Sequence, residues 1–531
     1  MKTTRREFLA SPAVLASRAA MASPAALAAQ AALTSRAALA AQAAGRPNIL
    51  LITDDQHNAR NLGCYGDTLV RTPNLDKLAA RGARFTHAYA NNMICAPSRV
   101  SMITGQYVHS HGYFGNSGEH PGRPVWMTSY LRQHGYQTAM IGKAHYGYKK
   151  VAQEFDFIRL CDRIDTPPEN PLKNDYFRML VEKGLENDGD DVLGGELGQN
   201  APARSRLPAE LSLEAWTADS TIEFLRKRDR NRPFFAFASF QRPHAPITPP
   251  APYDTMYKPS EVKLPPSVND TLAGKPAEQT AAAKRSGYPY HPQDQTKLQA
   301  IMAMYFGLIT LVDESVGRIL AELDAQNLTG TTLVIFTADH GDFSGEHGFF
   351  HKNLGMYEAI HRIPFIVAGP GFEGGRAREE LVQQIDIFPT ACEFAGVTIP
   401  ETVQGSSVLP LCRPGEGQWA RTAAFGEAED RNSIRTRRYR MIYDPGGKNN
   451  ELYDHSTDPW EMHNRYDDPA FQAVRLELAE EFLKFYSRTQ KQTNATSLRR
   501  GGGGGEMAPG PTRDLWWNRM DWKTVKRKYH L

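Results

Sequence analysis

Residues 48–55 read Asn-Ile-Leu-Leu-Ile-Thr-Asp-Asp, a short apolar run that ends in two adjacent carboxylates. A continuous apolar run of this length is typical of a strand buried on both faces of a parallel sheet. Similar runs recur at 138–142, 234–239, 332–337 and 364–367, and helical stretches lie between them, notably at 212–227 and 295–323. The alternation predicts an α/β fold with a doubly wound, mixed but mostly parallel sheet flanked by helices.

Acidic side chains follow two of these predicted strands. Asp54 and Asp55 end the first one, and the run 332–337 leads through an alanine into Asp339 and His340. Ligands of open α/β sheets bind beyond the carboxyl ends of the strands, and adjacent carboxylates there repel each other unless a cation lies between them. Hard oxygen ligands suit a divalent cation, so we predict a metal site at this edge. Solvated loop aspartates are the alternative.

Composition narrows the class of protein. The chain has 531 residues, with 62 Lys and Arg against 59 Asp and Glu, so it has no large excess of positive charge that would favour nucleic-acid binding. Its length predicts more than one domain, or one domain with a sizeable appendage. The five cysteines form no C-x-x-C pair, which argues against a structural zinc site. A disulfide between Cys392 and Cys412 stays open if the compartment is oxidising.

The first 45 residues are interpreted as a leader. Arg5 and Arg6 stand in a segment that resembles a twin-arginine export signal, and an Ala-rich stretch follows with several small residues between Ala28 and Ala44 that could be cleaved. We therefore expect export to a bacterial periplasm. No later apolar run is predicted to span a bilayer, so we expect no stable membrane anchor.

A pentapeptide points to the chemistry. Residues 95–99 read Cys-Ala-Pro-Ser-Arg, which matches the C-x-P-S-R signature of type I sulfatases. Further segments resemble that family in order: 141–147 is similar to its second signature G-K-x-H-x-G, and Pro243-His244-Ala245-Pro246, the Asp339-His340-Gly341 turn, 351–358, and 451–454 with 458–461 follow. The chain is therefore identified as a member of the formylglycine-dependent sulfatases of the alkaline phosphatase superfamily.

The resemblance implies a nucleophile and a metal. A formylglycine-generating enzyme would oxidise Cys95 to 3-oxoalanine (formylglycine), and its hydrate would attack a sulfated small molecule or glycan. The family pattern places Asp54, Asp55, Asp339 and His340 on one divalent ion, with residue 95 completing the shell. Calcium is expected, with manganese or magnesium as alternatives.

The resemblance also assigns the remaining catalytic roles. Arg99 would hold the hydrated aldehyde, one helical turn after residue 95. Lys143 and Lys352 would clamp sulfate oxygens as point charges. His244 would protonate the leaving alcohol, and His145 would deprotonate the second hydroxyl of the hydrate. Five other polar residues are interpreted as ordinary loop residues, with an approach to the pocket as the alternative for each: His109, His111, Asn116, His347 and His351.

Two other functions stay open. Many sulfatases have an asparagine where this chain has His340. The Asp-His-Gly turn resembles that of phosphonate monoester and phosphodiester hydrolases with the same nucleophile, and also that of some choline- and glycan-type sulfatases. Imidazole also fits transition metals better than an amide does. A catalytically inactive relative that binds sulfated glycans is the other alternative. The sequence fixes neither the substrate, nor the ion, nor the oligomeric state.

The predicted domain order is a leader at 1–45, a catalytic domain at 46–400 and a smaller C-terminal α+β subdomain at 401–500. Within that subdomain, 438–443 is predicted to be an edge strand and 469–486 an amphipathic helix, with a small antiparallel sheet implied by the family. Residues 501–531 form a Gly-rich break and an aromatic, basic tail.

Overall fold

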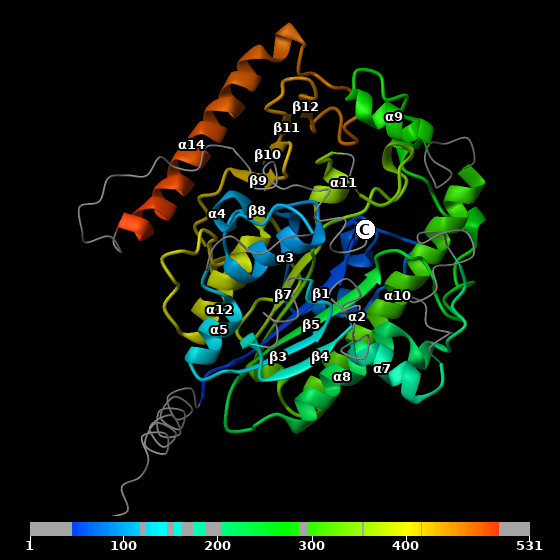
Figure 1. Ribbon diagram of the computed structural model, residues 1–531, viewed down its shortest axis with the longest axis vertical. Helices are drawn as coiled ribbons and strands as arrows, with labels where there is room; N and C mark the ends of the chain where they lie inside the picture. The colour runs from blue at the N-terminus through cyan, green and yellow to red at the C-terminus, as the bar shows by residue number, and fades with distance from the viewer. Residues whose placement is uncertain are drawn as a thin grey trace, which may run out of the picture. The chain divides into compact units, whose positions relative to one another are not determined.

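The computed structural model describes residues 45–116, 124–145, 153–161, 174–185, 203–285, 295–352, 355–415 and 417–498 (Figure 1). The predicted leader and the Gly-rich tail lie outside these residues. The chain divides into two compact units, Met1–Lys484 and Phe485–Leu531. The domain boundaries expected at 400 and 500 stay predictions.

An eight-stranded sheet forms the centre of the first unit, in the order β4-β3-β5-β1-β6-β7-β2-β8. Strand β7 is antiparallel to β6 and β2, whereas the other neighbouring strands of this sheet are parallel, so the predicted mixed, mostly parallel sheet is confirmed. The strands are β1 (Asn48–Asp55), β2 (Ala83–Tyr89), β3 (Gln137–Gly142), β4 (Phe157–Leu160), β5 (Phe234–Pro243), β6 (Thr332–Ala338), β7 (Phe365–Ala368) and β8 (Arg376–Gln383).

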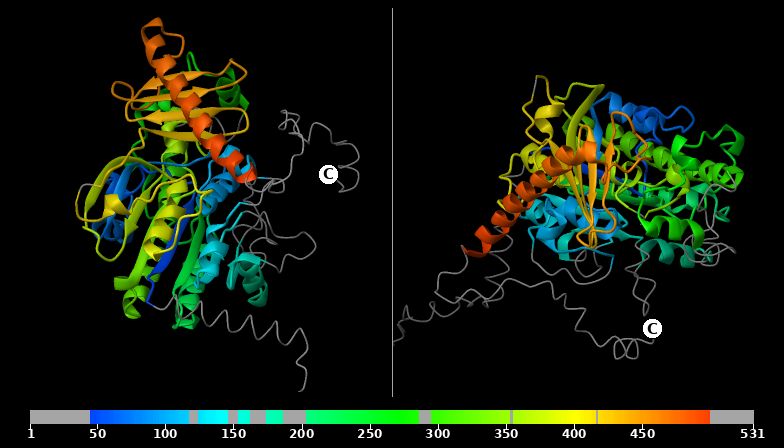
Figure 2. Two further views of the ribbon diagram at one scale, coloured as in Figure 1. Left: turned by 90° about the vertical axis from the view of Figure 1, so that its left-hand side faces the viewer. Right: turned by 90° about the horizontal axis from the view of Figure 1, so that it is seen from above.

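Helices cover both faces of this sheet (Figures 1 and 2). Alternate side chains of β1 enter different cores, because successive residues of a strand point to opposite faces: Ile49 and Leu51 belong to one core, and Leu50 and Ile52 to the other. The first core receives α3 (Cys95–Thr104), α5 (Met127–Gln133) and α12 (Ile387–Ala395), and the second receives α2 (Pro73–Ala80), α8 (Leu213–Lys227) and α10 (Gln295–Ala325).

Helix α10 corrects the expectation that no later run could span a bilayer. Among the described residues, α10 is the one helix that is long enough and apolar enough to span a bilayer, with a mean hydropathy of 1.4 in its most apolar window. However, 78% of that window is buried inside the protein, and its side chains pack on Leu50, Ile52 and their neighbours. Its apolar composition therefore fits a core helix.

The C-terminal part of the first unit contains a four-stranded antiparallel sheet in the order β12-β11-β10-β9. Its strands are β9 (Ala423–Glu427), β10 (Asn432–Thr436), β11 (Tyr439–Tyr443) and β12 (Glu451–Asp454). The prediction of an edge strand at 438–443 is wrong, because β11 pairs with β10 on one side and β12 on the other. The predicted C-terminal helix is present as α14 (Gln472–Leu498).

The disulfide that the sequence left open is not formed. Cys392 and Cys412 are both free and buried in the same apolar core, and Cys64, Cys95 and Cys161 are free as well. Burial raises the pKa of both Cys392 and Cys412 to about 12, which keeps these thiols protonated and unreactive.

Candidate active site

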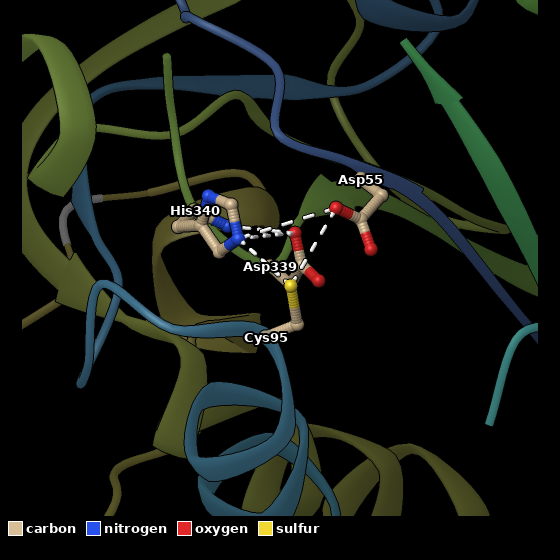
Figure 3. Close-up of side chains that lie close together, drawn as sticks. All are labelled: Asp55, Cys95, Asp339 and His340. Atoms are coloured by element: carbon tan, nitrogen blue, oxygen red, sulfur yellow. Dashed lines mark hydrogen bonds and ion pairs between the residues drawn. The ribbon is translucent and has the colours of Figure 1, made fainter. Parts of the chain in front are cut away.

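Four potential ligands converge at the carboxyl edge of the large sheet (Figure 3). Asp55 ends β1, Asp339 and His340 follow β6, and Cys95 is the first residue of α3. One ligand atom from each lies within 4.8 Å of those of the others, and all four side chains are buried. Cys95 Sγ lies 3.2 Å from His340 Nε2 and 3.8 Å from Asp55 Oδ1. The prediction from the sequence that these four side chains lie close together is confirmed.

The imidazole of His340 is held in one orientation. Its Nδ1 lies 2.9 Å from the carbonyl oxygen of Gly341, so that nitrogen carries the proton and donates it. The other nitrogen, Nε2, faces the four-residue group, 3.7 Å from Asp339 Oδ1 and 4.0 Å from Asp55 Oδ1. This arrangement leaves a lone pair of Nε2 for a metal ion.

Arg99 connects the carboxylates of Asp55 and Asp339. Its guanidinium is fully buried and donates from Nε to Asp339 Oδ2 at 2.8 Å and from Nη2 to Asp55 Oδ2 at 3.1 Å. From Nη1 it donates to the hydroxyl of Ser239 at 2.6 Å and to the carbonyl oxygen of Lys143 at 2.9 Å. Because both Oδ2 atoms are occupied, Asp55 Oδ1 remains to face Cys95, whereas Asp339 Oδ1 accepts from the backbone N–H groups of Gln56 and His340.

Two lysines bring positive charge to the same place. Lys143 follows β3, with its Nζ 2.7 Å from Asp55 Oδ2. Lys352 donates from Nζ to Cys95 Sγ at 2.8 Å and lies 2.9 Å from His340 Nε2. Burial raises the pKa of the Cys95 thiol, but the positive charges of Lys143 and Lys352 hold that pKa well below its usual value. The site therefore stabilises an anion at position 95.

The two candidate proton carriers flank the thiol. His244 Nδ1 lies 2.6 Å from the carbonyl oxygen of Ala245, which leaves Nε2 to face Asp55 Oδ1 at 4.0 Å. The His244 side chain is 26% exposed, so it lies at the solvent side of the site, and burial lowers its pKa. His145 is buried, adopts a left-handed backbone conformation (φ 60°) and lies close enough to Cys95 to lower the pKa of its thiol.

Asp54, the remaining predicted ligand, lies outside the four-residue group. Its Oδ2 atom is 2.5 Å from His57 Nδ1. Its Oδ1 atom is buried and has no hydrogen-bond partner among the described residues. A buried carboxylate oxygen without a partner costs free energy unless a cation or a donor meets it. The orphaned oxygen, with Asp55, Asp339 and His340, fits a divalent ion.

Three residues of the site carried no signal in the sequence. Ser239 accepts from Arg99, and His57 contacts Asp54. The third, Gln384, donates to the carbonyl oxygens of Ala338 and Asp339 at 2.8 and 2.7 Å and so holds the turn after β6. A neutral side chain or a single histidine in a loop is not distinguishable in a sequence from its many ordinary counterparts.

The five polar residues that are interpreted from the sequence as ordinary loop residues all have partners. His109 contacts Glu427 at 2.7 Å, His111 contacts Ser101 at 2.8 Å, and His347 contacts Asp270 at 2.7 Å. Asn116 and His351 lie closer to the catalytic residues. Asn116 accepts from the backbone N–H of Ala96, next to Cys95, and His351 Nδ1 lies 3.0 Å from Gln56 Nε2.

Comparison with known proteins agrees with this geometry. Residues 47–397 match the family model described as sulfatase, and 345–488 match the model of the C-terminal region of N-sulphoglucosamine sulphohydrolase. An arylsulfatase of Clostridium perfringens is 31% identical over 439 residues, which cover 79% of this chain and 90% of the relative.

Two solved structures extend the comparison. The phosphonate monoester hydrolase of Agrobacterium radiobacter has a TM-score of 0.74 and 26% identity, covering 84% of this chain and 96% of its own. A structure described as in complex with its substrate D-glucosamine-2-N,6-O-disulfate has a TM-score of 0.66 and 25% identity, covering 85% and 98%.

The fold and the site define a hydrolase of the alkaline phosphatase superfamily. Within that superfamily the chain belongs to the sulfatase family, whose members are sulfuric ester hydrolases. Membership implies a divalent metal ion and a formylglycine in general, and the four-residue group provides candidate ligands for the ion.

Proposed function

We propose that this protein hydrolyses sulfate esters of aryl or carbohydrate alcohols to the alcohol and inorganic sulfate, with the hydrated formylglycine at position 95 as nucleophile. The position of Cys95 carries the proposal. Its side chain lies between Lys352 and the Asp55–Asp339–His340 group, where an anionic nucleophile and an anionic ester both find positive charge. In this structure the Sγ atom stands where the oxygens of the hydrate would lie.

The same side chains would hold one divalent ion. Asp55, Asp339, His340 and the modified residue 95 provide ligands, and the orphaned Oδ1 of Asp54 provides a further one. Calcium suits the carboxylates, whereas manganese suits the imidazole better, and magnesium remains a further alternative. Such an ion polarises a sulfate oxygen and lowers the pKa of a bound hydroxyl.

In the first step, one hydroxyl of the hydrate loses its proton to Nε2 of the neutral His244 imidazole, its oxygen attacks the sulfur atom, and the bond from sulfur to the alcohol oxygen breaks. His244 gives its Nε2 proton to the departing alcohol, and its place at the solvent side of the site leaves room for that group. Lys143 and Lys352 hold the peripheral sulfate oxygens, on which negative charge is spread. The product is the alcohol and a sulfated hemiacetal.

In the second step, the sulfated hemiacetal is cleaved. His145 takes the proton of the remaining hydroxyl, the carbon–oxygen bond to sulfate breaks, and the aldehyde and inorganic sulfate form. Water then adds to the aldehyde and restores the hydrate. His145 suits this task because it is buried and lies close enough to residue 95 to lower the pKa of the Cys95 thiol.

Mass spectrometry of the tryptic peptide Phe85 to Arg99 tests the nucleophile. We expect the mass of an aldehyde at position 95 after production with a formylglycine-generating enzyme, because the proposal needs that enzyme as a partner. Active protein in which position 95 is an unmodified thiol would exclude the nucleophile.

A leaving-group series tests the general acid. His244→Ala should slow esters of weakly acidic alcohols by about 10²- to 10⁴-fold and slow esters of acidic phenols much less, because a good leaving group needs no proton. The matched control is His145→Ala, which acts after the alcohol has left and should slow the enzyme without this dependence. Equal losses across the series would exclude His244 as the acid.

Hydrolysis of phosphonate monoesters or phosphodiesters is the second candidate function. The similarity to the phosphonate monoester hydrolase and the histidine at position 340 favour it, since the same nucleophile could attack phosphorus. A panel of sulfate, phosphodiester and phosphonate esters with one common phenol separates the two. A higher kcat/KM for the phosphorus esters than for the sulfate ester would show that phosphorus esters, and not sulfate esters, are the preferred substrates. If Cys95→Ala left the biological effect unchanged, the protein would be a glycan-binding relative.

We also propose export to the periplasm through the twin-arginine segment. Changing Arg5 and Arg6 to lysine should keep the protein in the cytoplasm, as fractionation of the producing bacterium would measure. Unchanged export of this variant would exclude the twin-arginine route.

A further inference from the structure

We propose that His57 is the positioning residue that fixes the Asp54 carboxylate in the metal site. This inference rests on the metal ion of the proposed function and adds a residue that none of the sequence motifs contains. His57 and Asp54 are both fully buried, so neither side chain is held by solvent. Their contact is short, with 2.5 Å between His57 Nδ1 and Asp54 Oδ2.

The imidazole is fixed at both nitrogens. While Nδ1 faces Asp54, Nε2 lies 3.3 Å from the carbonyl oxygen of Asn61, four residues further along the same turn. No ring nitrogen of His57 is therefore left to bind an ion. His57 is not one of the four potential ligands, and it is fully buried, so a substrate that enters from solvent does not touch it. It therefore acts through Asp54.

The backbone of the same residue ties together the two turns that carry the ligands. His57 N–H donates to the carbonyl oxygen of His340 at 3.0 Å. One residue earlier, the backbone N–H of Gln56 donates to Asp339 Oδ1 at 3.1 Å. The turn after β1 is thus attached to the turn after β6, and the contact with Asp54 orients the carboxylate between them.

The consequence concerns the two oxygens of Asp54. A carboxylate can rotate and exchange its oxygens, but here Oδ2 is occupied by His57, whereas Oδ1 is buried without a partner among the described residues. His57 therefore selects which oxygen is presented to the ion. Partners that orient a ligand in this way contribute about 10- to 100-fold in metal affinity.

Calcium affinity of the matured enzyme tests this inference. After removal of metal with a chelator, calcium is titrated into wild type, His57→Leu, His57→Gln and His57→Asn by calorimetry. We expect about 10- to 100-fold weaker binding for the leucine and glutamine variants. In the asparagine variant the amide nitrogen lies near the position of Nδ1, so binding should recover to within a few fold of wild type. The control is His361→Asn, another buried histidine, which should leave calcium affinity unchanged.

The outcomes separate this inference from the proposed function. If wild type bound neither calcium nor, in the same titration, manganese or magnesium, the metal of the proposed function would be excluded, and this inference with it. If wild type bound calcium and His57→Gln bound it equally well, only the role of His57 would be overturned. If His57→Leu failed to fold, the glutamine and asparagine variants would decide the question, since both keep a polar side chain there.

Discussion

At the scale of single residues, the buried charges around Cys95 are paired with opposite ones, and the charge of residue 95 is the one that maturation changes. Asp55 and Asp339 share Arg99, and Asp55 also contacts Lys143. Lys352 instead contacts the sulfur of Cys95, whose pKa is held low. An aldehyde hydrate is neutral at that position. Its formation would release Lys352 for an anionic substrate.

Lys352→Gln should therefore weaken the binding of sulfate to the matured enzyme. The loss of one charge-assisted hydrogen bond is worth about 1.5–3 kcal/mol, which corresponds to roughly a 10- to 100-fold higher inhibition constant for inorganic sulfate. The control is Lys263→Gln on an exposed loop, which should leave the constant unchanged. An unchanged constant for Lys352→Gln would exclude a contact with sulfate.

His361 predicts a pH dependence of stability. Burial, and then the nearby Arg440, lower its pKa from 6.5 to about 3, so the folded protein keeps this imidazole neutral where the unfolded chain protonates it. Its Nδ1 accepts from Arg440 at 2.7 Å, which requires the neutral form. Below pH 6.5 the unfolded state binds more protons at this residue. As the pH is lowered, the contribution of His361 to the free energy of unfolding therefore falls by roughly 1.4 kcal/mol per pH unit, down to about pH 3.

Urea unfolding at several pH values measures this dependence. His361→Asn keeps an acceptor for Arg440 but does not titrate, so its stability should fall less steeply than that of wild type between neutral pH and about pH 5. Parallel curves for the two proteins would show that His361 does not contribute to acid unfolding.

At the scale of elements, the sequence predicts strands that are buried on both faces and misses strands that are not. β1 and β6 are continuous apolar runs with every residue buried. β8 reads Arg-Ala-Arg-Glu-Glu-Leu-Val-Gln and lies at the edge of the sheet, where charged side chains remain in solvent. β2 mixes polar and apolar residues. Neither pattern differs enough from a loop to be recognised.

The same reasoning explains which site residues were predictable. Asp55 and Asp339 follow recognisable strands, and the fold brings the ends of parallel strands together. Ser239 also lies on a predicted strand, but a buried hydroxyl gives no sign of its partner. The inner position of β11 was missed because pairing partners depend on the order of strands in space.

The end of β3 depends on Gly142, which has a φ of +89°. A Cβ there would lie 1.9 Å from the carbonyl oxygen of Ser239, so Gly142→Ala should push β3 away from β5 and displace Lys143 and Ser239. Displacements of about 1 Å in a site can cost roughly 10²-fold in activity. We expect a loss of that size in kcat/KM.

Gly274→Ala is the matched control for this prediction. Gly274 has a similar φ of +73°, but nothing lies within 4 Å of its Cβ position. It should show the cost of backbone strain, about 1 kcal/mol, without the loss of activity. If Gly142→Ala retained wild-type kcat/KM, the close approach of β3 and β5 would not position the site.

At the scale of the whole molecule, buried charges join the small C-terminal sheet to the segment that follows Lys352. Arg440 of β11 is fully buried and contacts Glu461 and Glu358, each at 2.5 Å. It also donates to the carbonyl oxygen of Met356 at 2.9 Å, four residues after Lys352. The position of that lysine is thus linked to the packing of the second sheet.

Arg440→Met tests this link. The substitution removes the cation that Glu358 and Glu461 share and leaves Arg435 as the partner of Glu358 and His455 as the partner of Glu461, so it should cost at most about 3–5 kcal/mol in the free energy of unfolding. Lys352 should also lose its position, with a fall in kcat/KM under conditions where the variant is still folded. The control is Arg438→Met, whose partner is Asp454 and whose side chain is 57% exposed, so its loss should cost about 0–1 kcal/mol. If the two variants unfolded at the same urea concentration and had equal activity, the buried network would contribute nothing to holding the second sheet or the site.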